Sequence, residues 1–145
     1  MNEDEKWNYI NSLDEELLRG SVFTSEWSVF LARDAETAYC KGANLAAILA
    51  AIAAIETWLR WGYSSSFPKK YPTLFEMIEE SDFPDDLKNE LHMLRKYRNK
   101  WVHVDNPDDD ETLVSKPEYV ESEMENRAKS AIKLMLQVLY FEQGT

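Results

Sequence analysis

The segment from Asn44 to Trp61 constrains the fold of this chain more than any other. It is rich in Ala, Ile and Leu around almost the whole circumference of a helix rather than along one stripe. That pattern is typical of a helix buried against several neighbours, because a surface helix keeps one polar face. Glu56 interrupts the apolar surface, and Arg60 lies four residues later, where it can pair with it. We therefore expect a central helix that ends with Gly62 in the left-handed position.

The remainder of the chain also favours helix. Only four Gly and five Pro interrupt its 145 residues, and Ala, Leu, Glu, Lys and Met fill long stretches between them. A hydrophobic content of 44% is enough to close one core at this length. The predicted fold is all-α, a single up-and-down helical bundle over residues 1–145. Within it, residues 1–20 form an N-terminal arm with a short helix, and residues 21–141 form the bundle.

Capping residues set the expected helix bounds in the first part of the chain. Ser12-Leu13-Asp14-Glu15 has the pattern of a capping box that opens a short helix ending at Gly20. A second helix begins near Thr24 or Ser25 and ends around Lys41-Gly42. Its expected apolar stripe consists of Trp27, Phe30, Leu31, Ala35, Ala38 and Tyr39.

Similar signals place three more helices. Residues 63–72 are a loop by composition, and the capping box that begins at Thr73 opens a short helix to about Ser81. Pro84 opens a helix that runs to Trp101 or Val102, and Pro117 opens the last helix, to Phe141. The stretch 105–117 between these two helices holds two prolines and an acidic run, so we expect a solvated connection.

Composition also indicates the cellular compartment in which the protein folds. The single cysteine, Cys40, can form neither an internal disulfide nor a Cys-based zinc site. The acidic start, Met1 to Lys6, lacks the pattern of a signal peptide, and the longest apolar run, Leu45 to Ile55, is too short to span a bilayer. We expect a cytoplasmic protein that makes no membrane contact.

The formal net charge of −11 disfavours non-specific binding to a phosphate backbone, so any contact with nucleic acid must be local. A local basic cluster does exist, in Arg98-Asn99-Lys100-Trp101-Val102-His103 and the residues before it. On an ideal helix, Arg98 shares one side with Leu87, Leu91, Leu94 and Trp101, in line with core residues.

His103 follows Arg98 by five residues, about 140° around a helix, so the two side chains diverge if that helix simply continues. They can converge if the helix stops before His103. They can also meet those of a symmetry copy across a dimer interface. The residues leave both routes open.

The spacing Arg98-Asn99-x-x-x-His103 resembles the signature of HEPN domains, small helical bundles that usually dimerise. Leu91 to Tyr97 resembles the helix before that signature, and Ala50 to Glu56 resembles the Ala-rich central helix of the family. The resemblance implies a metal-independent endoribonuclease without a cofactor, commonly a toxin or defence component. It also implies a homodimer in which the motifs of two protomers face each other, and an antitoxin or another regulatory protein as partner.

Under this resemblance, Arg98 stabilises the phosphate in the transition state, His103 acts as general acid or base, and Asn99 orients the phosphate or the helix end. The residues expected to support them are Glu56, Arg95, Lys96, Tyr97, Lys100 and Trp101. Each assignment has a structural alternative. Arg98 can pair with a carboxylate such as Glu56, and Tyr97 and Trp101 can be core or interface aromatics rather than surfaces for stacked bases.

His92, the other histidine, lies on the polar side of the same helix, and we expect it to be exposed and structural. The chain lacks a Gly-rich phosphate loop, a His-x-x-x-His pair and the spacing of a calcium loop. The acidic residues Asp105 and 108–111 would repel RNA if they folded over the motif, which is compatible with a regulatory loop. The alternatives to a ribonuclease are a non-catalytic HEPN module for dimerisation or protein interaction, and a nucleotide-binding module.

Overall fold

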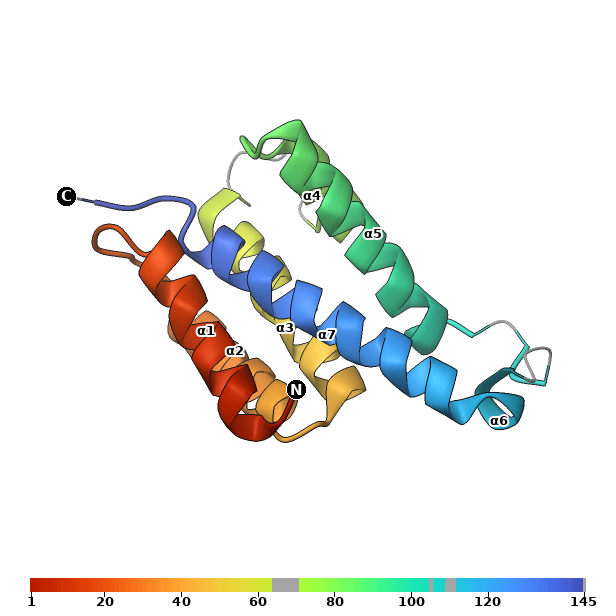
Figure 1. The fold of residues 1–145 in the computed structure, drawn as a ribbon. Coiled ribbons are helices and arrows are strands. Elements are labelled where there is room, and N and C mark those ends of the chain that lie inside the picture. Colours follow the sequence, from red (N-terminus) through yellow and green to blue (C-terminus); the bar gives the residue numbers. More distant parts are fainter. Residues whose placement is uncertain (64–70, 105, 109–111, 145) are drawn as a thin grey trace.

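The structure, a computed structural model, describes residues 1–63, 71–104, 106–108 and 112–144 (Figure 1). Over these residues the protein is helical, as predicted, and the one β feature is an isolated bridge between Ser21 and Gly144. The helices are α1 (Glu3–Leu17), α2 (Glu26–Cys40), α3 (Asn44–Tyr63), α4 (Leu74–Glu80), α5 (Asp85–Val102), α6 (Thr112–Ser115) and α7 (Pro117–Leu139).

Helix α3 is the centre of the core, as its composition predicts. It packs chiefly against α2 and α7, and α4 and α5 also contact it. Five of its side chains are completely buried: Ala47, Ile48, Ala51, Ala54 and Leu59. Helix α7 lies between the α1–α2 pair and the α4–α5 pair (Figure 1). The two long apolar helices therefore hold the remaining helices together.

Helix α3 is longer than the apolar run that the sequence singles out. By length and composition, Asn44–Gly62 is sufficient to cross a membrane, so the argument from the shortness of Leu45 to Ile55 is wrong. In this fold 44% of that apolar window is buried, and α2, α4, α5 and α7 contact the helix. The residues that make it apolar are the ones that build the core.

Helix α2 has the predicted bounds and part of the predicted buried face: Ala35 and Tyr39 are buried, and Leu31 and Ala38 are partly buried against the core. Ser25 caps it by accepting a hydrogen bond from the backbone N–H of Ser28. Its buried residues are Ser28, Ala32, Ala35, Tyr39 and Cys40. Trp27 and Phe30, which the periodicity places in the core, are 78% and 57% exposed. Helix α2 packs against α3, and small buried residues allow this close packing, whereas bulky rings would hold the two helices apart.

Helix α1 begins ten residues earlier than the predicted short helix. Asn2, not Ser12, is the cap: its Oδ1 accepts from the backbone N–H of Glu5, and the Glu5 carboxylate accepts from the backbone N–H of Asn2. Ser12 lies within the helix and donates its hydroxyl to the carbonyl of Tyr9. A helix that starts at Glu3 buries Lys6 and Ile10 on the same face as Leu13. This additional burial explains why Asn2, rather than Ser12, caps the helix.

Of the remaining expectations, the one about Gly62 is wrong and the one about the capping box at Thr73 is confirmed, and helix α6 was not expected. Gly62 is still helical, so it does not end α3, and the positive φ belongs to Gly42, at +84° between α2 and α3. The capping box between Thr73 and Glu76 is present at the start of α4. In the stretch 105–117, the short helix α6 was not predicted. Residues 64–70 of the expected loop lie outside the described residues.

Lys6 is the most buried charged residue, with 4% exposure. Its ammonium lies 3.1 Å from the Glu125 carboxylate and donates a 3.2 Å hydrogen bond to the carbonyl of Tyr39. It also lies 4.8 Å from the centroid of the Tyr39 ring. Lys6 therefore joins α1 to both α2 and α7. Sequence reasoning missed this role because lysine is rarely buried.

Candidate functional site

The candidate site lies at the C-terminal end of α5. Asp85 and Asp86 occupy the first turn of this helix, where acidic groups are favoured, and the last helical residue is Val102. His103 follows as the C-cap, with φ −128° and ψ 62°. Its backbone N–H still donates to the carbonyl of Asn99, at 2.9 Å. The prediction that the helix stops before His103 is confirmed.

Arg98 and Asn99 are held together in the last turns of α5. Both are half-buried, and Nε of Arg98 donates a 2.9 Å hydrogen bond to Oδ1 of Asn99. In the described part of the chain, Arg98 makes no ion pair with a carboxylate. Glu56, one of its expected partners, instead pairs with Arg60, at 3.3 Å. The guanidinium of Arg98 is therefore oriented by an amide, and no carboxylate of the described residues pairs with it.

His103 is exposed just beyond the helix. Within residues 1–63, 71–104, 106–108 and 112–144, neither of its ring nitrogens has a hydrogen-bond partner. No hydrogen bond in that part of the chain joins its side chain to Arg98. The structure thus joins the Arg98 side chain to Asn99 and joins the Asn99 carbonyl to the backbone N–H of His103. The imidazole of His103 has no hydrogen-bond partner within the described residues.

Tyr97 and Trp101 pack into the molecule beside the motif. Tyr97 is buried, and its ring meets that of the half-buried Trp101 edge-on, with the centroids 6.4 Å apart. The Arg127 guanidinium of α7 lies 5.0 Å from the Tyr97 ring, and the Lys100 ammonium lies 5.9 Å from the Trp101 ring. Burial raises the pKa of the Tyr97 phenol. Tyr97 is therefore a packing residue and offers no free face for a stacked base.

The expectation that His92 is exposed is wrong. Its side chain is 14% exposed, and Nε2 lies 2.7 Å from the Glu79 carboxylate of α4. Its Nδ1 accepts a hydrogen bond from Nε of Arg95, at 3.4 Å, and its ring lies against Phe75, with the centroids 5.0 Å apart. Sequence reasoning missed this cluster because α4 reaches α5 only through the tertiary fold.

The remaining basic residues of the motif region have two kinds of environment: Arg95 packs against α4, whereas the two lysines are exposed. Arg95 stacks on Phe75, with its guanidinium carbon 5.2 Å from the ring centroid, so it belongs to the contact between α4 and α5. Lys96 and Lys100 are exposed. Of the acidic connection, Asp108 is exposed, whereas Asp105 and residues 109–111 lie outside the described residues.

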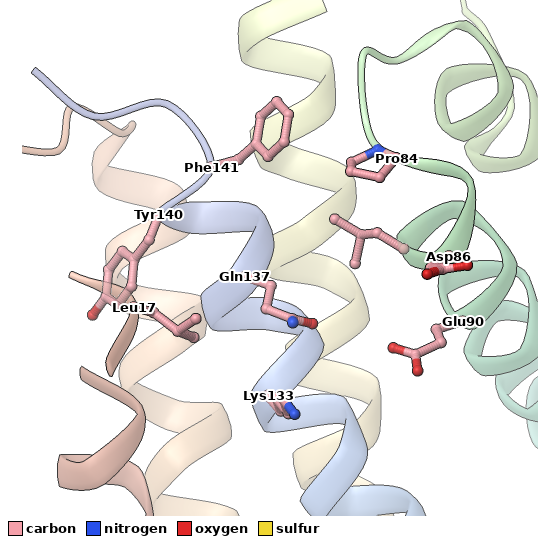
Figure 2. Close-up of a pocket in the computed structure, with 9 residues that line it drawn as sticks. Leu17, Pro84, Asp86, Glu90, Lys133, Gln137, Tyr140 and Phe141 are labelled. Atoms are coloured by element: carbon pink, nitrogen blue, oxygen red, sulfur yellow. The ribbon is translucent and has the colours of Figure 1, made fainter. Parts of the chain in front are cut away.

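A separate pocket of about 520 Å³ lies between the N-terminal half of α5 and the C-terminal half of α7 (Figure 2). Asp86 and Glu90 line one wall, and Lys133 and Gln137 line the other. The Gln137 Oε1 atom is buried and has no hydrogen-bond partner. The pocket contains no residue of the Arg98 to His103 motif.

No group of three or more His, Cys, Asp or Glu side chains able to hold a metal ion occurs among the described residues. Among the described residues, the motif itself presents one imidazole, one guanidinium and one amide at a helix end. Compared with protein-family models, curated proteins and solved structures, the chain matches none.

Proposed function

We propose that this protein is a metal-independent endoribonuclease that acts through Arg98, Asn99 and His103. The observation that carries the proposal is the end of α5 at Val102, which leaves an exposed imidazole five residues after an arginine that makes no ion pair within the described residues. This agrees with the residue pattern shared with HEPN domains. The setting that the resemblance implies is a cytoplasmic toxin or defence protein restrained by a partner.

The proposed reaction uses the 2′-hydroxyl of RNA as nucleophile. A neutral His103 accepts the proton of that hydroxyl while its oxygen attacks the adjacent phosphorus. The bond from phosphorus to the 5′-oxygen breaks, and this oxygen leaves with a proton from a protonated imidazole or from water. The products are a 2′,3′-cyclic phosphate and a 5′-hydroxyl. Negative charge on the phosphate oxygens is stabilised by Arg98.

The comparison of the two histidines supports His103 as the acid or base. Proton transfer needs a ring nitrogen that can reach the substrate. Both nitrogens of His92 are engaged, one by Glu79 and one by Arg95. Those of His103 have no partner in the described part of the chain, and its side chain is open to solvent.

The helix end favours a site assembled within each subunit. Because His103 lies beyond α5, the divergence of about 140° that a continuous helix imposes does not apply to it. The alternative is a composite site, with Arg98 from one protomer and His103 from the other. Mixing Arg98→Ala with His103→Ala distinguishes the two, since only a composite site regains activity in mixed dimers.

The decisive experiment incubates purified protein with total cellular RNA in excess chelator. The wild type is expected to cleave, and Arg98→Ala and His103→Ala are each expected to lose about 100-fold or more in rate. His92→Gln is the matched control and should retain activity. Cleavage that requires added metal, or that survives both alanine variants, would contradict the mechanism.

A protein-interaction role is the second candidate, and one observation favours it. Phe23, Trp27 and Phe30 are 86%, 78% and 57% exposed and lie close together in sequence at the start of α2. Exposed aromatic clusters of this kind mark binding surfaces for other proteins. Wild-type protein that leaves all RNA intact, yet retains a partner on this surface, would support this role instead.

A further inference from the structure

A pocket of about 330 Å³ lies where α1, α2 and the end of α7 meet. Trp7 of α1, Ala32 of α2 and two leucines of α7, Leu136 and Leu139, give it apolar walls. Small-molecule sites in proteins have volumes of ~300–1,000 Å³ and combine apolar walls with a few polar groups. No residue of the motif from Arg98 to His103 lines this pocket, so it is independent of the proposed ribonuclease site. We call it the α1–α2 pocket.

Two polar residues that line the α1–α2 pocket, Thr24 and Glu36, lack a partner. The hydroxyl oxygen of Thr24 is buried and has no hydrogen-bond partner. The side chain of Glu36 is half-buried and makes no hydrogen bond or ion pair within the described residues. Polar groups left without a partner in a protein interior are unfavourable. A ligand that donates hydrogen bonds to both groups would remove that penalty.

The carboxyls of Asp14 and Glu36 interact in this part of the molecule. Asp14 of α1 accepts a 2.7 Å hydrogen bond from the hydroxyl of Tyr140, which follows α7 and lines the pocket. Burial, and secondarily the charge of Asp14, raises the pKa of Glu36 to about 7. Burial also raises the pKa of the Cys40 thiol to about 11 and that of the Tyr140 phenol, so both groups stay neutral near pH 7. None of these groups supplies a cation to Glu36.

Among the described residues that line the pocket, Arg33 is the only cation. Its side chain is 62% exposed, and its Nε lies 3.2 Å from the carboxylate of Asp34. Its guanidinium carbon also lies 4.6 Å from the centroid of the Phe30 ring, another exposed group. Arg33 is therefore engaged at the surface of α2. The charge that remains without a counterion in the pocket is negative, so the ligand that complements it is a cation.

We infer that the α1–α2 pocket binds a small molecule that carries a protonated primary amine on an apolar body. The ammonium donates to the carboxylate of Glu36 and to the hydroxyl oxygen of Thr24. The apolar body packs against Trp7, Leu136 and Leu139. A primary ammonium suits these two acceptors because it is compact and has three N–H donors and no acceptor of its own.

This assignment makes binding depend on pH. An alkylamine stays protonated below about pH 10, as lysine does, so the charge of the ligand is constant between pH 5.5 and pH 8. With a pKa of about 7, about one Glu36 carboxyl in thirty is ionised at pH 5.5. Because the cation pairs with the ionised form, the apparent affinity should fall at least ~10-fold from pH 8 to pH 5.5. At pH 6, binding should transfer close to one proton from Glu36 to the buffer.

Isothermal titration calorimetry with hexylamine at pH 8 and pH 5.5 tests the proposal. The wild type should bind hexylamine saturably and at least ~10-fold more tightly at pH 8. Hexanol, a neutral analogue of the same length, should bind more weakly at pH 8 and without this dependence on pH. Titration at pH 6 in two buffers of different ionisation enthalpy measures the proton release, which should be close to one per hexylamine.

Three variants assign the effect to the pocket. Glu36→Gln, which keeps the shape of the protonated carboxyl, should weaken hexylamine at pH 8 at least ~10-fold and abolish the proton release. Thr24→Val keeps the shape of the side chain without its hydroxyl and should weaken hexylamine ~3-fold to 10-fold. Glu26→Gln, exposed on the same helix as Glu36, is the matched control and should behave as the wild type.

Three outcomes would overturn the proposal. The first is the absence of saturable binding up to ~10 mM hexylamine at pH 8. The second is equal affinity for hexylamine and hexanol, or unchanged binding in Glu36→Gln, since either result leaves only an apolar cavity. The third is tighter binding of Nα-acetyl-lysine methylamide than of hexylamine, because the ligand would then be a lysine side chain of a partner protein rather than a small molecule.

Discussion

Nε of Arg98 donates a 2.9 Å hydrogen bond to Oδ1 of Asn99, in the last turns of α5. The carbonyl of the same asparagine accepts the backbone N–H of His103, also at 2.9 Å. Asn99 thus contacts both neighbours in the motif, through its side chain on one side and its backbone on the other. Its role in the proposed site is to orient Arg98 rather than to touch the reacting atoms.

We expect Asn99→Ala to lower the rate of RNA cleavage about 10-fold to 100-fold, because the guanidinium loses the group that orients it. The backbone bond to His103 remains, so the melting temperature should stay close to that of the wild type. Steady-state cleavage and thermal unfolding, measured on the same preparation, check this. Asn89→Ala, which changes an exposed asparagine in the first half of α5, is the matched control. Equal activity of the wild type and Asn99→Ala would exclude the orienting role.

Glu36 is expected to make stability depend on pH. Burial, and secondarily the charge of Asp14, raises the pKa of this carboxyl to about 7 from its ordinary value of 4.5. The folded state therefore holds the proton more tightly than the unfolded state, and stability falls as pH rises from about 4.5 to about 7. Glu36→Gln should remove this fall and stabilise the protein by about 1–2 kcal/mol at pH 8.

Urea unfolding of the wild type and Glu36→Gln at pH 4.5 and pH 8 measures this difference. The gain should be confined to the higher pH, where the wild-type carboxyl is ionised. Glu121→Gln, exposed on α7, serves as control and should leave the pH profile unchanged. A wild-type stability that does not fall between the two pH values would contradict the burial of a protonated Glu36.

The core around α3 should tolerate no added volume. Ala51 is completely buried, and we expect Ala51→Leu to lower the free energy of unfolding by about 1–3 kcal/mol through overpacking. Trp27→Ala removes a far larger side chain that is 78% exposed, and should change stability by less than about 0.5 kcal/mol. Denaturant midpoints rank the two, and the reverse order would refute the orientation of α2.

Lys6→Met should destabilise the protein by about 1–3 kcal/mol, since the carbonyl of Tyr39 loses its buried donor and Glu125 loses the nearer of its two cations. Calorimetry of the purified variant measures the change. The comparison is Lys41→Met, which removes an exposed ion pair with Glu3 and should leave the unfolding temperature almost unchanged. Equal effects of the two substitutions would show that the buried contacts of Lys6 do not stabilise the packing of α1 against α2 and α7.

Much of the helical organisation follows from local sequence. The caps at Ser25 and Thr73, the acidic first turn of α5 and Pro117 at the start of α7 satisfy backbone groups within a few residues of themselves. The end of α5 before His103 was predicted from the same kind of local signal. Asn2 and Ser12 both have the pattern of a cap, and only packing decided between them, by burying Lys6 and Ile10.

The amino-acid sequence by itself determined that this protein is helical, that Asn44 onward is its central helix and that Arg98, Asn99 and His103 follow one another at a helix end. Only the tertiary structure decided which faces are buried. It placed Trp27 outside, enclosed Lys6, and joined His92 to Glu79 across two helices. The physical reason is the range of the interactions, because caps and helix ends depend on residues that are close along the chain. The burial of a face depends on the shape and polarity of whichever helix packs against it.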